Sequence, residues 1–143
     1  MKNLKMKTLT VSANLDSLKP LADYVIQASE AANLDKKKTY KLRLAVDEIA
    51  TNIITHGYEE TGKTGNITIS GEIDSNGLKI TLEDTAVFFD PREKMSAEVE
   101  TIDQPLEKRN IGGLGIYLTI SGVDEFQYKR VDNRNYNIFT MCF

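Results

Sequence analysis

The chain has little that thiol or imidazole chemistry could use. Among its 143 residues, Cys142 is the only cysteine and His56 is the only histidine. A single cysteine excludes an internal disulfide and a cysteine-based metal cluster. A single histidine excludes a multi-histidine zinc site, and any Ser-His-Asp or Cys-His catalytic site would have to use His56.

The chain also lacks an excess of basic residues and a long apolar run. It has 18 Lys and Arg residues against 21 Asp and Glu residues, which gives a net charge of -3. Because binding to a phosphate backbone needs a basic surface, nucleic acid is not expected as the main partner. No apolar run approaches the roughly 20 residues that span a bilayer, and residues 1–5 have no apolar signal core. We therefore expect a cytoplasmic protein without a membrane partner.

Three helices are predicted from the spacing of the apolar residues. The predicted helices cover residues 18–33, 35–56 and 112–121. Asn14 or Asp16 is expected to cap the first helix, because short polar side chains accept hydrogen bonds from free N–H groups. Gly57 is expected to end the second helix, since glycine often terminates helices.

Alternating apolar and polar residues predict five strands. The predicted strands cover residues 7–13, 66–73, 78–82, 125–131 and 136–143. Turns are expected at Asp74–Gly77 and Asp132–Asn135. Thr85–Asn110 shows little periodicity and is expected to form a long lid. At 143 residues, with 41% hydrophobic content, the chain is expected to form one domain over residues 1–143. The fold class expected is α+β, a two-layer sandwich with helices on one face of a mostly antiparallel sheet.

The first segment that suggests chemistry is Asp47–Asn52 together with His56. Glu48, Asn52 and His56 recur every four residues and therefore lie on one stripe of the predicted helix, at the border of its apolar face. A half-buried carboxylate at Glu48 is a candidate for a group whose pKa is shifted for catalysis. The amide oxygen of Asn52, one turn later, can bind Mg²⁺. The alternative is an ordinary solvated helix edge, with His56 favoured near the helix end.

The second segment is Asp84-Thr85-Ala86 followed by Phe89-Asp90-Pro91. Asp84 comes where the predicted strand 78–82 gives way to the loop, a common position for ligand-facing groups. A carboxylate there can accept a hydrogen bond from an exocyclic amine such as that of adenine. The alternative is an aspartate that only initiates a turn.

The third segment is Gly112-Gly113-Leu114-Gly115, which continues as Ile116-Tyr117-Leu118. These glycines open a predicted helix, and free N–H groups at a helix start bind phosphate. Lys108 and Arg109 precede the glycines and could add positive charge to the same phosphate, or could be ordinary lid surface. The alternative for the glycines themselves is a tight turn.

A different phosphate-binding pattern occurs at Gly57–Thr64, which matches G-x-x-x-x-G-K-[ST] in full. That motif requires a strand before it and a helix after it. Here a predicted helix precedes the pattern and a predicted strand follows it. We interpret it as a helix-to-strand connection, and a phosphate site using Lys63 and Thr64 remains the weaker alternative.

Together and in this order, the three segments resemble the nucleotide-contacting boxes of the histidine-kinase-like (Bergerat-fold) ATPases, and most closely those of the anti-sigma factor serine/threonine kinases. The resemblance runs through nearly the whole chain. It implies that Glu48 activates the attacking hydroxyl and that Asn52 holds Mg²⁺. It also implies that Asp84 reads the adenine of ATP and that the glycines of the third segment, Gly112, Gly113 and Gly115 with Leu114, bind its phosphates.

The resemblance also implies partners. Members of this family phosphorylate a serine or threonine on an anti-sigma factor antagonist, sequester a sigma factor, and are commonly homodimers. One departure stands out, because the glycine of the family's second box is Ala86 here. A β-carbon beside the adenine, or at a position that needs positive φ, is expected to weaken nucleotide binding. The alternative to a kinase is therefore a weak or inactive partner-binding module of the same fold.

Overall fold

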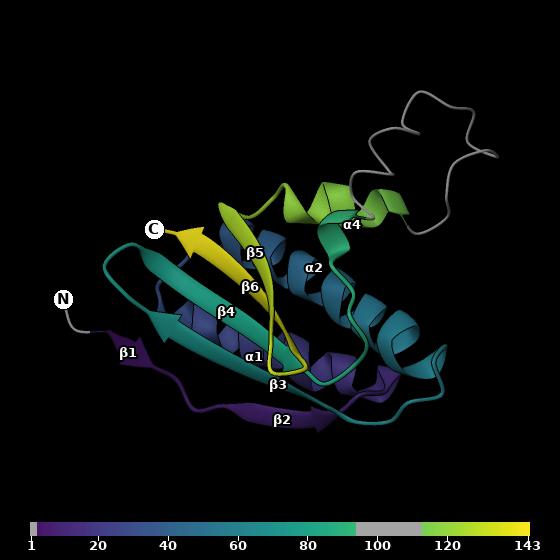
Figure 1. Cartoon of the computed structure of the whole chain (residues 1–143). Helices are drawn as coiled ribbons and strands as arrows, with labels where there is room; N and C mark the ends of the chain where they lie inside the picture. Colours follow the sequence, from purple (N-terminus) through teal and green to yellow (C-terminus); the bar gives the residue numbers. More distant parts are fainter. Residues whose placement is uncertain (1–2, 94–112) are drawn as a thin grey trace.

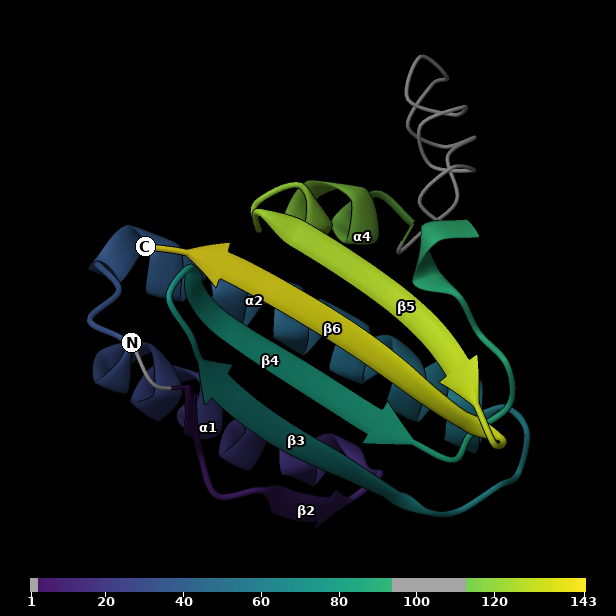
Figure 2. The same ribbon diagram turned by 60° about the vertical axis from the view of Figure 1, so that its left-hand side comes forward.

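The computed structural model describes residues 3–93 and 113–143 of the chain. In this part, helices α1 (Leu18–Ala31), α2 (Lys36–Asn52) and α4 (Gly113–Ile120) lie against one face of an antiparallel sheet, as both views of the ribbon show (Figures 1 and 2). This arrangement confirms the predicted two-layer α+β sandwich.

The sheet contains the five predicted strands and one short strand that the sequence did not predict. The strands are β1 (Leu4–Lys5), β2 (Leu9–Ser12), β3 (Asn66–Ile73), β4 (Gly77–Asp84), β5 (Glu125–Val131) and β6 (Arg134–Cys142). Their order is β1-β3-β4-β6-β5, with β2 also paired to β3. Every described strand pair is antiparallel. Strands β4 and β6 are therefore neighbours although α4 and β5 separate them in the chain.

The beginnings of the two long helices differ in how well the sequence predicted them. Helix α1 follows a single 3₁₀ turn, η1 (Leu15–Ser17), so the residue at its start is Ser17. Asn14 begins that 3₁₀ turn and makes no side-chain capping bond, so neither Asn14 nor Asp16 caps α1. Helix α2 has a true cap, since the Asp35 carboxylate accepts a hydrogen bond from the N–H of Lys38 at 2.8 Å.

The end of the second helix was predicted wrongly. Regular α-helix stops at Asn52, and a π-helix, η2 (Ile53–Glu59), carries the chain onward through Gly57. The hydroxyl of Thr61 then donates to the carbonyl oxygens of Gly57 at 2.8 Å and Tyr58 at 3.1 Å. The left-handed glycine that ends this helical segment is Gly62, whose φ is 70°, and the N–H of Lys63 donates to the Tyr58 carbonyl at 3.0 Å as in a Schellman motif. The stop therefore lies at Gly62 and not at Gly57. π-Helical turns inside helices are rare and occur often at functional sites.

The core lies between the helices and the sheet. Its largest fully buried side chains come from the helices α1, α2, η2 and α4 and from the three central strands: Leu21, Leu42, Ile49, Ile54, Tyr58, Ile67, Ile69, Leu78, Ile80, Leu82, Ile116 and Phe139. Burying each such side chain contributes about 1.5–3 kcal/mol. This packing holds α2 in a defined position over β4 and β6. No helix in residues 3–93 and 113–143 is long and apolar enough to cross a membrane.

The closing hairpin has a tighter turn than predicted. Asp132 and Asn133 have φ angles of 51° and 62°, as a two-residue hairpin turn of the mirror-image type requires. Asn135, expected in a four-residue turn, is therefore the second residue of β6. Strand β4 also runs to Asp84 instead of ending at Leu82, and the pairing of β4 with β6 places Asp84 opposite Asn135.

Candidate functional site

The first segment places Glu48 and Asn52 one turn apart on α2, as the spacing predicted. The Asn52 side chain is 6% exposed, and Glu48 is half-buried. The Asn52 amide nitrogen donates to the backbone carbonyl of Glu48 at 2.7 Å and lies 3.5 Å from the Glu48 carboxylate. This hydrogen bond turns the amide nitrogen back along the helix and the amide oxygen away from it.

The end of the first segment meets the second segment directly. The ring of His56 stacks on Phe89 with ring centroids 6.0 Å apart and an interplanar angle of 25°, and its Nδ1 lies 2.9 Å from a carboxylate oxygen of Glu60. Two residues later, the Tyr58 hydroxyl accepts a hydrogen bond from the N–H of Thr85 at 2.9 Å. The fold thus brings the first and second segments together, and His56 is packed against the loop that follows β4.

Ala86, the departure in the second segment, packs on Gly57 of the π-helix. Its side chain is 2% exposed, and a Cβ added to Gly57 would lie 2.8 Å from the Ala86 Cβ. The described non-glycine residues with left-handed φ are Asn33, Asp132 and Asn133, so Ala86 does not need a glycine conformation. Ala86 therefore has an ordinary φ, and its methyl group packs in the core.

Asp84 is a buried carboxylate with one satisfied oxygen and one unsatisfied oxygen. It is 2% exposed, and its Oδ1 accepts from the N–H of Ala86 and from the Asn135 amide, both at 2.9 Å. Its Oδ2 is buried and has no hydrogen-bond partner. Burial raises the pKa of Asp84 above its ordinary value, while these two hydrogen bonds and the Arg130 charge offset part of the rise; the Glu83 charge adds to it. A buried unpaired carboxylate oxygen is costly and is a candidate ligand contact.

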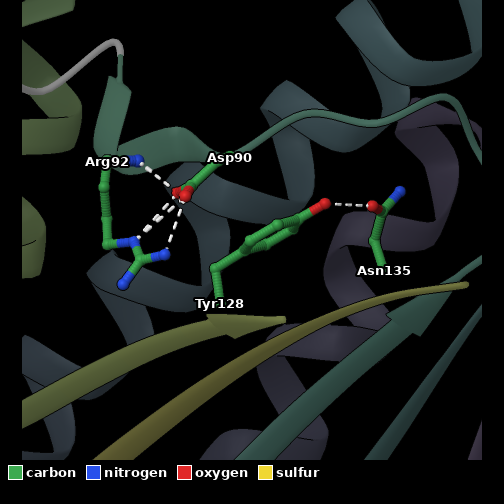
Figure 3. A network of polar contacts seen from close by, with 4 residues as sticks. All are labelled: Asp90, Arg92, Tyr128 and Asn135. Carbon is green, nitrogen blue, oxygen red and sulfur yellow. Dashed lines mark hydrogen bonds and ion pairs between the residues drawn. The ribbon is translucent and has the colours of Figure 1, made fainter. Parts of the chain in front are cut away.

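Three residues of the β5–β6 hairpin support Asp84 and were missed by the sequence analysis. The Asn135 oxygen accepts from Arg130 at 2.9 Å and from the Tyr128 hydroxyl. Figure 3 shows Tyr128 pointing at Asn135, with the pair of Asp90 and Arg92 beside it. The only sequence signal for this cluster was the Asp-Asn pair at 132–133, since these residues tolerate a two-residue turn that would move Asn135 into the strand.

The described beginning of the predicted lid is anchored. The Asp90 carboxylate binds the Arg92 guanidinium, with Oδ2 to Nη2 at 2.7 Å and Oδ1 to Nε at 3.0 Å. Burial acts to raise the pKa of Asp90, but the hydrogen bonds from Arg92 outweigh it and hold that pKa below its ordinary value. The Phe88 ring meets Tyr128 edge-on at 5.7 Å between centroids. Residues 94–110 of the expected lid lie outside the described part.

The alternative phosphate loop at Gly57–Thr64 has the surroundings expected of a connection. The π-helix η2 precedes its glycine-lysine end and strand β3 follows it, as the sequence analysis predicted. The Lys63 ammonium donates to the backbone carbonyl of Thr85 at 2.8 Å. Lys63 therefore ties this connection to the loop after β4.

The third segment begins α4, as predicted. Ile116 and Ile120 of this helix are buried, and α4 packs on α2. Figure 1 shows the start of α4 and the α2 layer on the same face of the sheet. Lys108, Arg109 and Gly112 lie outside the described residues, and so do the side-chain surroundings of residues 113–115.

The raised pKa of Asp84 gives a testable pH dependence of stability. Because its pKa in the folded protein lies above the ordinary 3.8, the folded protein binds more protons than the unfolded chain between these two values. The stability contributed by the protonated carboxyl is fully present below pH 3.8 and is lost as the pH rises through the raised pKa. We expect the free energy of unfolding of the wild type, relative to Asp84→Asn, to fall across this window in urea titrations. A difference that stays constant with pH would contradict the assignment.

Comparison with known proteins shows the family to which the chain belongs. The family model of the histidine kinase-like ATPase domain matches residues 11–143. The chain is 32% identical over 89 residues to the serine-protein kinase RsbW of Bacillus licheniformis, covering 59% of this chain and 53% of that protein. It is 33% identical over 84 residues to RsbW of Staphylococcus aureus, covering 58% and 53% respectively. The chain thus spans about half the length of the curated relatives it matches.

Solved structures show the same fold at low sequence identity. The histidine kinase domain of a blue-light activated histidine kinase from Erythrobacter litoralis matches 89% of this chain and 59% of its own, with a TM-score of 0.54 and 15% identity. A structure of RsbU and RsbW domains from Mycobacterium tuberculosis matches 96% of this chain and 32% of its own, with a TM-score of 0.58 and 11% identity. With the family match over residues 11–143, these findings establish that the chain belongs to the histidine kinase-like ATPase domain family.

Proposed function

We propose that this chain binds Mg²⁺-ATP and acts as a protein serine/threonine kinase of the anti-sigma type. The observation that carries the nucleotide site is the buried Asp84 Oδ2, which has no partner within the described protein. The 6-amino group of adenine is a neutral donor that fits this single acceptor. ATP bound there would satisfy the one oxygen of the carboxylate that the fold leaves unpaired.

The first segment supplies the groups for phosphate transfer. Asn52 presents its amide oxygen as a Mg²⁺ ligand, because its nitrogen is occupied by the Glu48 carbonyl at 2.7 Å. Among the described residues no cluster of three His, Cys, Asp or Glu side chains could hold a metal. Bound Mg²⁺ would neutralise charge on the phosphates, and an ion held largely by those phosphates needs only one or two protein ligands. Glu48, on the same helix edge, accepts the proton of the attacking hydroxyl.

The phosphates are assigned to the third segment. The N–H groups at the start of α4 provide the donors, with Gly113, Leu114 and Gly115 in its first turn. Gly112 and the charges of Lys108 and Arg109 complete this part of the proposal. Ala86 belongs to the proposed adenine-binding turn. Its backbone N–H donates to Asp84 Oδ1 at 2.9 Å and so helps to position this carboxylate.

The substrate proposal rests on the relatives, which are named serine-protein kinases. We assign as phosphoacceptor a serine or threonine of an anti-sigma factor antagonist, and as the second partner a sigma factor. A homodimer in the cytoplasm and a single domain over residues 1–143 belong to the same proposal. The competing function is a nucleotide-dependent binding module without transfer. The burial of Ala86 and its packing on Gly57 support the kinase.

Titration calorimetry of the whole chain tests the nucleotide proposal. ATP with Mg²⁺ is expected to bind about 10- to 100-fold more tightly than GTP, since the guanine carbonyl would face the Asp84 acceptor and leave a buried hydrogen bond unmade. Lys63→Ala is the control for the alternative phosphate loop and should change ATP affinity by less than about tenfold. Equal affinity for ATP and GTP would refute the role of Asp84, and loss of ATP binding in Lys63→Ala would favour the alternative loop.

A further inference from the structure

Asn135 is a buried amide whose orientation is determined by its partners. Its oxygen accepts from the Arg130 guanidinium at 2.9 Å, and a guanidinium can only donate. Its nitrogen lies 3.0 Å from the carbonyl oxygen of Val87 and 3.2 Å from that of Ala86, which can only accept. Exchanging the two ends of the amide would oppose like groups at each of these contacts. The Asn135 nitrogen must therefore be the end that meets Asp84.

This orientation determines the hydrogen-bonding polarity of residue 84. The Asn135 nitrogen and the N–H of Ala86 converge on one oxygen of Asp84, each at 2.9 Å. A carboxylate or amide side chain at position 84 must therefore place an acceptor oxygen at the position of Oδ1, where these two donors meet. The other end of that group, the position of Oδ2, is then the end that remains to meet a ligand. In Asp84 that end is also an acceptor.

We infer that Asn135 is a positioning residue that determines base specificity, by imposing which end of the side chain at position 84 faces the purine. This inference rests on the proposed function, because it takes Asp84 as the residue that binds the base. The site accepts a purine with an amino group at position six, and it rejects one with a carbonyl oxygen there. Arg130 and Tyr128 contribute indirectly, because both donate to the Asn135 oxygen and so orient its amide.

The first test exchanges the polarity of residue 84 without changing its shape. In Asp84→Asn, the amide oxygen is expected at the place where the two donors converge, so that the NH₂ group takes the position of Oδ2. The wild type should bind ATP about 10- to 100-fold more tightly than inosine triphosphate, whose position six carries a carbonyl. The variant should reverse this order and bind inosine triphosphate more tightly than ATP, as measured by calorimetry.

The second test removes the Asn135 donor and keeps the approximate shape of the side chain. Asn135→Leu is close to asparagine in size and shape and has no donor toward Asp84. The ratio of ATP affinity to inosine triphosphate affinity should fall at least about fivefold in this variant, since about 1 kcal/mol of hydrogen bonding to one end of the carboxylate is lost. Thr140→Val, which removes a half-buried hydroxyl farther along β6 and opposite Lys79, is the control and should keep the wild-type ratio.

The outcomes separate this inference from the proposed function. A wild type that binds neither nucleotide overturns both. A wild type that prefers ATP, with an Asp84→Asn variant that weakens both nucleotides equally, overturns the inference and leaves ATP binding intact. A wild-type ratio in Asn135→Leu overturns the role of Asn135. Thermal melting of each variant checks folding, and the Asp84→Asn result stands even if Asn135→Leu does not fold.

Discussion

A Glu48→Gln variant is expected to bind Mg²⁺-ATP with nearly wild-type affinity and to transfer phosphate about 10²- to 10⁴-fold more slowly, the contribution typical of a general base. Glutamine keeps the length of the side chain and an oxygen acceptor, so the 3.5 Å contact with the Asn52 amide can persist. What it removes is the ability to accept a proton from the attacking hydroxyl. The measurement is phosphoserine or phosphothreonine formed on a candidate antagonist protein with labelled ATP, alongside calorimetry with ATP.

Asp47→Asn is the matched control for this experiment. Asp47 is the neighbouring carboxylate on α2 and is also half-buried. Its Oδ2 lies 3.8 Å from the Arg43 Nε. Successive residues differ by about 100° around a helix, so Asp47 does not share the edge of Glu48 and Asn52. Transfer should survive in this control. A Glu48→Gln protein that transfers phosphate at the wild-type rate would exclude Glu48 as the base, and a wild type that binds ATP and antagonist without transfer would favour the binding module.

A Gly57→Ala substitution is expected to destabilise the fold by about 1–3 kcal/mol, the range for overpacking a filled core. The new Cβ would lie 2.8 Å from the Ala86 Cβ, and both carbons are attached to backbone that packing holds in place. In the Ala86→Gly background this contact is gone. The double variant should therefore lie closer to wild-type stability than the sum of the two single changes predicts, by at least about 1 kcal/mol.

Urea unfolding of the wild type, both single variants and the double variant measures this coupling. Calorimetry on Ala86→Gly measures whether this substitution changes ATP affinity. Because the Ala86 methyl is 2% exposed and packs on Gly57, its removal should change ATP affinity by no more than a few-fold, about 1 kcal/mol or less. Additive stabilities would show that the two positions do not constrain each other. A large gain in ATP affinity in Ala86→Gly would show instead that the alanine does obstruct the nucleotide.

Local pattern was sufficient for most of the secondary structure. The alternation at 66–73 and the apolar stripe of the second helix match β3 and α2, because side-chain periodicity directly records which face of an element is buried. The errors are the missed two-residue strand β1 and the ends of elements, where local pattern carries little information. The helical segment continues through Gly57 and ends at Gly62, which has the left-handed φ, and the last hairpin turns on two residues because Asp132 and Asn133 accept left-handed φ.

By itself, the sequence determined the order of the three segments, the α+β class and the candidate residues Glu48, Asn52 and Asp84, since each depends on spacing within one element or on the order of elements. Only the tertiary structure decided what surrounds them. Asn135 meets Asp84 across 51 residues of chain, through the register of β4 and β6, and no local spacing records that pairing. The π-helix likewise places Gly57 against Ala86, a packing between two separate elements that no local spacing records.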